Sequence, residues 1–302
     1  MIIIGGATAS GKSGLALNVA KKINGEIISA DSMQIYKKMD IGTAKTMPNE
    51  MDGIKHYMLN VVEPNQNFTV ADYSIMAKEC IKDIKSRGKV PIIVGGTGLY
   101  INSLIYDYKL SDQNIELRNQ LNNELEKNGK EFMYNKLQEI DTKGASTIHI
   151  NNTKRVIRAI EVKLNTNKSI ADNNDKLSSV PHLLYAIDYD REILYQKINK
   201  RVDDMMQNGL VDEVKWLNNN GVGFDCQSMQ AIGYKEFHDY FLGNNDLNKT
   251  IELIKQHSRN YAKRQQTWFV RIPTCKWLKM DNIDSLSNII IQEYNNNITN
   301  LE

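Results

Sequence analysis

Hydrophobic residues follow two alternating patterns along the first hundred positions. Residues 1–4 and 89–94 are short apolar runs, which are typical of strands buried on both faces of a parallel sheet, and 26–30 is predicted as a further strand between them. Apolar residues at helical spacing follow the two runs, over 15–23 and 99–104. Strands that alternate with helices predict an α/β fold, in which helices flank a parallel sheet.

The pattern changes near residue 111. From there Leu117 and Leu121 begin a series of apolar residues at helical spacing among many charges, and no strand pattern is found until a new apolar run begins at 182. We therefore predict a helical insertion domain over 113–181, which divides an α/β core into 1–112 and 182–302.

A glycine-rich loop joins the first apolar run to the first helix. It fits G-x-x-x-x-G-K-[ST], the phosphate-binding P-loop, in the strand–loop–helix context that this motif requires. Its backbone N–H groups and the start of the helix attract phosphate, Lys12 adds a cation, and the Ser13 hydroxyl is a ligand for Mg2+. The alternative is a chance match in a glycine-rich turn. We predict a P-loop NTPase-like core whose di- or triphosphate site is formed by Gly6, Ala7, Thr8, Ala9, Ser10, Gly11, Lys12 and Ser13.

Polar residues also follow the other two early strands. Asp31 comes directly after the second strand, and Thr97 lies in a second glycine-rich loop, 95–98, after the third. Open α/β sheets bind ligands at the carboxyl ends of their strands, so these residues are candidates for the same site. For Asp31, a role as the cap of the following element is an equally good interpretation.

Basic residues at two places in the chain are candidates for anion binding. Arg155 and Arg158 lie three apart on one predicted helix beside Lys154, although a solvated charged face is the ordinary interpretation of such a group. Arg201 lies on a later helix, where a surface ion pair with Asp204 at (i, i+3) is the alternative.

The segment 251–280 has seven Lys or Arg residues and one acid, interleaved with four large aromatic residues. A polyanion partner and a helix with a buried aromatic face explain this composition equally well.

Composition narrows the class of protein. The 302 residues have a net charge of +2, and 41% are hydrophobic, which is enough for a real core. The three cysteines are far apart, so we expect reduced thiols rather than disulfides or a zinc site. The chain has no apolar run long enough to span a membrane and no leader pattern, so we expect a cytoplasmic protein with no membrane partner.

Seven segments, taken in order, closely resemble the tRNA dimethylallyltransferase family. The resemblance covers nearly the whole chain, and the ordered set is far more specific than the P-loop alone. Two departures are Ala7, where the family usually has proline, and Thr153, where a basic residue is usual. The matching segments are 6–13, 31–36, 39–45, 95–100, 155–162, 230–236 and 261–269.

The resemblance implies a prenyl transfer. Dimethylallyl diphosphate would donate its prenyl group to N6 of the adenosine at position 37, beside the anticodon, in tRNAs that read codons beginning with U. Backbone N–H groups of residues 8–13, Lys12 and Mg2+ at Ser13 would hold the departing diphosphate, and Arg201 would clamp it. Asp31 would be the general base, and Thr97 would bind the adenosine.

The resemblance also implies a set of tRNA contacts, and we expect the protein to be a monomer. The alternatives are a small-molecule or nucleotide kinase that binds ATP at the P-loop, a prenyltransferase that acts on free adenine nucleotides, and a nucleotide-switched RNA-binding protein without chemistry of its own. The helical insertion and the basic segment favour RNA over a free nucleotide. The residues implied in tRNA binding are Asp31, Ser32, Met33, Gln34, Thr97, Arg118, Lys154, Arg155, Val156, Ile157 and Arg158.

Overall fold

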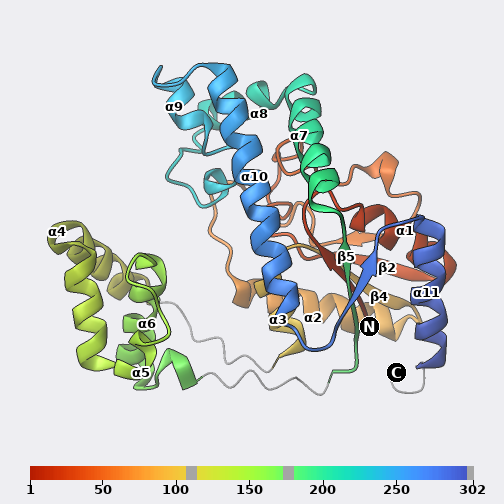
Figure 1. Ribbon diagram of the computed structural model, residues 1–302, viewed down its shortest axis with the longest axis horizontal. Coiled ribbons are helices and arrows are strands. Elements are labelled where there is room, and N and C mark those ends of the chain that lie inside the picture. Colours follow the sequence, from red (N-terminus) through yellow and green to blue (C-terminus); the bar gives the residue numbers. More distant parts are fainter. Residues whose placement is uncertain (107–113, 173–179, 298–302) are drawn as a thin grey trace. The chain divides into compact units, whose positions relative to one another are not determined.

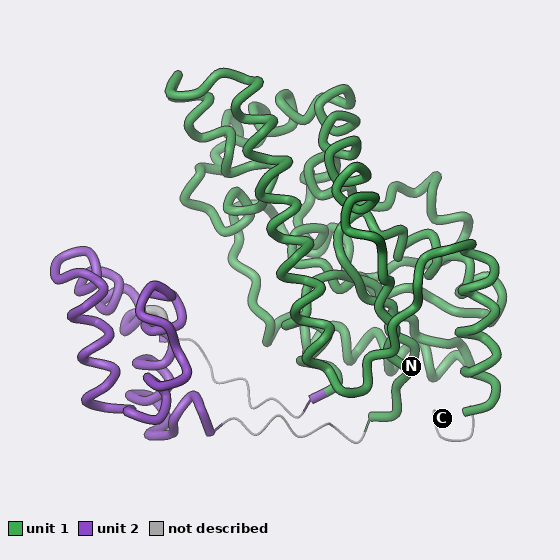
Figure 2. The backbone as a smooth tube through the Cα atoms, in the orientation of Figure 1, with its two compact units in different colours: residues 1–105, 179–302 green, residues 106–178 purple. Residues whose placement is uncertain are grey.

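The computed structural model describes residues 1–106, 114–172 and 180–297. The chain forms two compact units (Figure 2): unit 1 contains 1–105 and 179–302, and unit 2 contains 106–178. The boundary expected at 112/113 lies outside the described residues. The second part of unit 1 starts at Ser179, three residues before the expected start at 182. Near this boundary the Met1 amino group donates to the Pro181 carbonyl.

A six-stranded sheet with order β3-β2-β4-β1-β5-β6 forms the centre of unit 1, and all of its strand pairs are parallel. The predicted α/β class is therefore confirmed. The four strands expected from apolar runs are present as β1 (Ile2–Gly6), β2 (Gly25–Ser29), β4 (Val90–Gly95) and β5 (Leu183–Asp188).

The sequence did not predict the two edge strands. β3 (His56–Tyr57) has only two residues in an irregular stretch. β6 (Cys275–Lys279) lies in the basic segment, where Lys276 and Lys279 interrupt the apolar residues of a partly exposed strand. Edge strands are less buried than central ones, so they lack the apolar run that identifies a central parallel strand.

Helices α1 (Lys12–Lys22) and α11 (Ile283–Asn296) cover one face of the sheet (Figure 1). Side chains alternate between the faces of a strand, so Ile2 and Ile4 of β1 both meet this layer. They pack with Leu15 and Val19 of α1 in an apolar cluster of the unit-1 core, to which α11 contributes Ile290.

The opposite face is covered by α2 (Val70–Ser86), α3 (Gly98–Ile105) and α10 (Leu247–Val270). Close packing of α10 on β1 depends on Gly5, because a Cβ at this position would lie 2.3 Å from the Phe269 ring. The remaining helices of unit 1 are α7 (Arg191–Gln207), α8 (Leu210–Asn219), α9 (Phe237–Phe241) and the short 3-10 turns Pro48–Glu50 and Ser228–Gln230.

Unit 2 has a separate helical core. It contains α4 (Ile115–Ile140), α5 (Thr142–Ala145), α6 (Thr153–Thr166) and a 3-10 turn, Ile170–Asp172. Gly129, with a φ of 82°, breaks α4 into two arms, a conformation that favours glycine. Buried Leu121, Met133 and Leu137 of α4 pack against Ile160 of α6, so unit 2 buries its own apolar stripe.

Candidate active site

The P-loop follows β1 and leads into α1. Ala9 and Gly11 both have left-handed backbone conformations, with φ of 61° and 79°. Such reversals turn successive N–H groups toward one side, as in an anion-binding nest. The N–H groups of Ala9, Gly11, Lys12 and Ser13 have no acceptor among the described residues.

Two N–H groups of the expected cradle are already used. The N–H of Thr8 donates to Gln265 Oε1 at 2.9 Å, and that of Ser10 donates to the Ala7 carbonyl at 3.3 Å. In this structure the N–H groups of Thr8 and Ser10 thus have protein acceptors, and phosphate binding by the N–H groups of residues 8–13 stays a prediction. Ala7 itself is buried and packs against Leu194, which agrees with a supporting role rather than a ligand.

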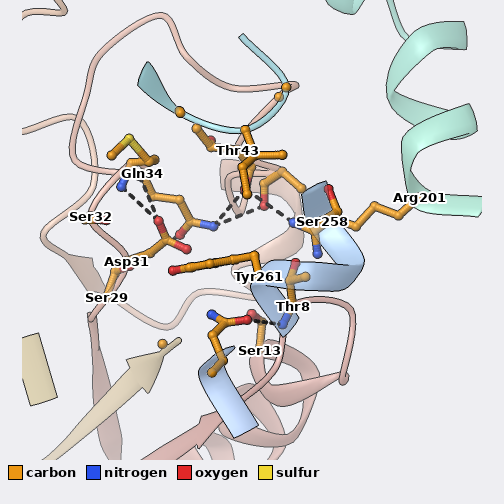
Figure 3. A pocket seen from close by; sticks show the side chains of 18 of the residues that line it. Thr8, Ser13, Ser29, Asp31, Ser32, Gln34, Thr43, Arg201, Ser258 and Tyr261 are labelled. Carbon is orange, nitrogen blue, oxygen red and sulfur yellow. Dashed lines mark hydrogen bonds between the residues drawn. The ribbon is translucent and has the colours of Figure 1, made fainter. Parts of the chain in front are cut away.

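A cavity of about 340 Å³ opens beside the P-loop (Figure 3). Its wall includes Lys12 and Ser13 from the start of α1, Asp31 from the end of β2, and Arg201 from α7. Elements that are far apart in the sequence thus place a carboxylate, two cations and a hydroxyl around one space. Asp31 and Arg201 line this cavity together with Thr8, Lys12 and Ser13 of the phosphate loop.

Lys12 and Arg201 are two cations with little to balance them. Burial and the nearby Arg201 lower the pKa of Lys12 to about 8, partly offset by Asp31. Burial also lowers the pKa of Arg201, again against the influence of Asp31. Lys12 Nζ donates to the Ala7 carbonyl at 3.2 Å, and Arg201 Nη2 donates to the Thr43 carbonyl at 3.3 Å. A polyphosphate anion between them would relieve this electrostatic cost.

The surface ion pair considered for Arg201 is not formed. Asp204 instead pairs with Lys200, with Nζ and Oδ1 at 3.6 Å, while Arg201 reaches from α7 into the cavity (Figure 3).

Asp31 fulfils both interpretations of its position. Its Oδ1 accepts from the N–H groups of Met33 at 2.9 Å and Gln34 at 3.3 Å, and so stabilises the turn after β2. Its Oδ2 has no hydrogen-bond partner among the described residues. One oxygen of this carboxylate is therefore structural and the other is available to a ligand.

Thr97 lies beside the cavity rather than in its wall. Its Oγ1 accepts from the Ser32 N–H at 3.1 Å and its hydroxyl is 3.4 Å from the Ser32 hydroxyl. Ser32, Met33 and Gln34 do line the cavity. The Gln34 amide is already engaged, because Nε2 donates to the carbonyls of Thr43 and Ala44 and Oε1 accepts from Ser29 Oγ.

The sequence did not single out two cavity residues on α10. Tyr261 and Gln265 lie one turn apart, and the Tyr261 hydroxyl points toward Asp31 (Figure 3). Burial and Asp31 raise the pKa of Tyr261 to about 12, so the phenol keeps its proton. Gln265 joins the two glycine loops, because it accepts from Thr8 and donates to the Gly96 carbonyl at 3.0 Å. Their (i, i+4) spacing in the 261–269 motif is the signal that could have identified them.

The candidate tRNA residues of unit 2 separate into three groups. Lys154 and Arg155 are exposed at the start of α6. Arg118 and Arg158 both pair with Glu161, which is fully buried. Val156 and Ile157 belong to the core of unit 2, with 1% and 5% exposed, so their side chains are covered in this structure and the tRNA contacts that the resemblance implied for them stay a prediction.

The residues of the cavity wall fit a magnesium ion whose ligands come partly from the protein and partly from a bound phosphate. Ser13 is exposed on the cavity wall in the first turn of α1, and Asp31 lines the same space. Over the described ranges, no group of three His, Cys, Asp or Glu residues could hold a metal by itself. Mg2+ commonly takes one or two protein ligands and completes its shell with phosphate and water, so such a group is not required.

The chain is similar to known proteins along nearly its whole length. Residues 34–272 match the model of the family described as IPP transferase. A tRNA dimethylallyltransferase of Acetivibrio thermocellus is 49% identical over 96% of this chain and 95% of its own. Another, from Clostridioides difficile, is 49% identical over 96% of each chain.

Solved structures agree with these relatives. A tRNA delta(2)-isopentenylpyrophosphate transferase of Staphylococcus epidermidis is 44% identical, with a TM-score of 0.72 over 98% of both chains. A eukaryotic dimethylallyltransferase acting on tRNA is 30% identical, with a TM-score of 0.83 over 99% of this chain and 79% of its own.

In the described part of the chain, no helix is both long enough and apolar enough to cross a lipid bilayer.

Proposed function

Since the chain belongs to the IPP transferase family, we propose that it transfers a dimethylallyl group from dimethylallyl diphosphate to N6 of adenosine 37 in tRNAs that read codons beginning with U. The observation that carries this proposal is the single cavity shared by Lys12, Arg201 and Asp31. It offers positive charge for a leaving diphosphate and a carboxylate for the amine that replaces it.

The diphosphate leaves as the allylic C–O bond breaks, and it gains negative charge at that moment. The free N–H groups of Ala9, Gly11, Lys12 and Ser13, with the side chains of Lys12 and Arg201, would stabilise this charge. Such preorganised electrostatic stabilisation is usually the largest catalytic term. Ser13 would hold Mg2+, which when bound supplies further positive charge to the same oxygens.

Asp31 would accept the proton of the attacking amine. The exocyclic amine of adenosine is a weak nucleophile, because its lone pair is delocalised into the ring. Its nitrogen bonds to C1 of the prenyl group while Asp31 Oδ2 takes the proton. Thr97 would hydrogen-bond the adenosine from the glycine-rich loop after β4, where its Oγ1 also accepts from the Ser32 N–H.

The base must leave the anticodon loop to reach this cavity, as it must for other enzymes that modify bases. Ser32, Met33 and Gln34 would contact it, since they line the cavity beside Asp31. The exposed cations Lys154 and Arg155 of unit 2 would bind tRNA phosphates.

Incubation with unmodified tRNA and dimethylallyl diphosphate, followed by mass analysis of the nucleosides, tests this proposal. We expect one adenosine per tRNA to gain a five-carbon prenyl unit and diphosphate to be released. A parallel reaction with ATP measures phosphate release without prenyl donor. ATP consumption with no prenylated nucleoside would contradict the proposal and favour a kinase.

A further inference from the structure

The side chain of Glu213, on α8, accepts an unusual number of hydrogen bonds from one loop. Residues 40–44, here called the 40–44 loop, follow the turn that contains Asp31 and border the cavity. Glu213 Oε2 accepts from the N–H groups of Asp40 at 2.8 Å and Ile41 at 2.7 Å, and Oε1 accepts from that of Gly42 at 3.1 Å. Three consecutive backbone donors thus converge on one carboxylate.

A fourth donor fixes the carboxylate itself. The hydroxyl of buried Tyr234 donates to Glu213 Oε1 at 2.6 Å. The Tyr234 ring also lies against Gly42, where an added Cβ would be 2.5 Å from a ring carbon. The loop can approach this pair so closely only because residue 42 has no side chain.

A buried lysine holds the far end of the same loop. Lys45 is 4% exposed, and its Nζ donates to the Tyr36 carbonyl at 2.6 Å, to Asp40 Oδ1 at 2.7 Å and to Asn60 Oδ1 at 2.7 Å. The 40–44 loop is therefore fixed by charged groups at both ends, although it contains no helix or strand.

The middle of the loop supports two residues of the cavity. The carbonyl of Thr43 accepts from both Arg201 Nη2 and Gln34 Nε2, and the carbonyl of Ala44 accepts from Gln34 Nε2 (Figure 3). These carbonyls orient Arg201, a candidate ligand of the diphosphate, and Gln34, a candidate contact of the base. Their positions depend on the backbone that Glu213 holds.

We propose that Glu213 is a positioning residue that fixes the 40–44 loop, so that Thr43 can hold Arg201 and Gln34 in the cavity. It lines neither the cavity beside Asp31 nor its neighbour beside Asp40, and so acts only through the loop. This inference rests on the proposed function, which assigns Arg201 to the diphosphate and Gln34 to the base. The contacts of Glu213 can nevertheless be tested without any prenyl transfer.

Glu213→Gln is the decisive variant. Glutamine has one acceptor oxygen, and its NH2 group would face at least one N–H or O–H donor. We expect fast hydrogen exchange at the amides of residues 40–42, with protection in β1 and β4 retained. Misplacing Arg201 should weaken binding of inorganic pyrophosphate by about tenfold in calorimetry and raise the KM for dimethylallyl diphosphate by a similar factor. Asp212→Asn removes the same charge from the neighbouring exposed position on α8 and should change neither measurement.

A variant on the loop side tests the same interaction with Glu213 intact. In Gly42→Ala the new methyl group must displace the loop from Tyr234, so we expect the same reduction of pyrophosphate affinity. This variant decides the question if Glu213→Gln does not fold. Unchanged exchange at 40–42 and unchanged pyrophosphate affinity in the folded variant would overturn the proposal.

Failure of the proposed function would look different. A wild-type protein that prenylates no tRNA contradicts that function, whereas the exchange rates at 40–42 still show whether Glu213 fixes the loop.

Discussion

Asp31 divides its two carboxylate oxygens between a turn and the cavity, which makes a clean substitution possible. Asp31→Asn keeps an Oδ1 acceptor for Met33 and Gln34 but has no basic oxygen for the amine proton. We expect kcat to fall by ~100-fold or more, since general base catalysis contributes about that much. Single-turnover prenylation of unmodified tRNA measures this.

The comparison with Asp31→Ala separates the two roles of Asp31, because alanine also removes the turn hydrogen bonds. tRNA affinity should be retained in Asp31→Asn, as judged by filter binding. An Asn variant that keeps wild-type turnover would show that Asp31 is not the base.

The two cavity cations make diphosphate binding dependent on pH. An anion favours protonated Lys12, but in the free protein burial and Arg201 lower the pKa of Lys12 to about 8. Lys12 is therefore charged below that pH and progressively neutral above it. Affinity for inorganic pyrophosphate should fall as the pH rises through about 8, which calorimetry over a pH series will measure.

Lys12→Arg is the matched variant for this pH series, because a guanidinium remains charged throughout the range. Pyrophosphate ionises identically in both titrations, so only the difference between the two curves reports Lys12. Parallel curves would show that Lys12 does not titrate near this pH.

At the scale of elements, Gln265 ties together the loops that follow β1 and β4. Replacing it with leucine leaves the Thr8 N–H and the Gly96 carbonyl without their partners. Unsatisfied buried groups cost ~1–3 kcal/mol each, so we expect the free energy of unfolding to fall by at least that amount. Denaturant titration followed by tryptophan fluorescence measures it.

Gln266→Leu changes the next residue of α10, which has no such bridge, and serves as the control for Gln265→Leu. Equal stability of the two variants would show that the bridge contributes little.

The elements that sequence analysis found are those whose burial leaves a local pattern. Four strands could be predicted because burial on both faces gives continuous apolar runs. β3 and β6 could not, because edge strands lack those runs.

Sequence-based prediction of the cavity residues has the same limit. The P-loop and Asp31 are local signals, and the family resemblance supplied Arg201. Glu213, however, binds a loop more than 170 residues away in the sequence, and nothing local to either segment indicates that they meet.

At the scale of the whole molecule, the two units have different proposed roles. All the residues given for the cavity wall, from Thr8 to Gln265, belong to unit 1. Unit 2 has its own core and presents Lys154 and Arg155 to solvent, while Arg118 and Arg158 are occupied with Glu161. Removal of the exposed pair should therefore affect tRNA but not the small substrate.

We expect the Lys154→Ala/Arg155→Ala double variant to weaken tRNA binding and to reduce the salt slope of log K by about one for each phosphate that is no longer neutralised. Pyrophosphate affinity should be unchanged, since unit 1 contains that site. Lys127→Ala, at an exposed position of α4, removes one charge from the same unit and should reduce the slope less than Lys154→Ala or Arg155→Ala does alone. Filter binding over a series of salt concentrations distinguishes specific phosphate binding, which only the α6 variants would remove, from a diffuse attraction, which the removal of any cation would reduce. Equal slopes for all variants would exclude these two residues from tRNA recognition and leave the cavity wall of unit 1 as the better candidate.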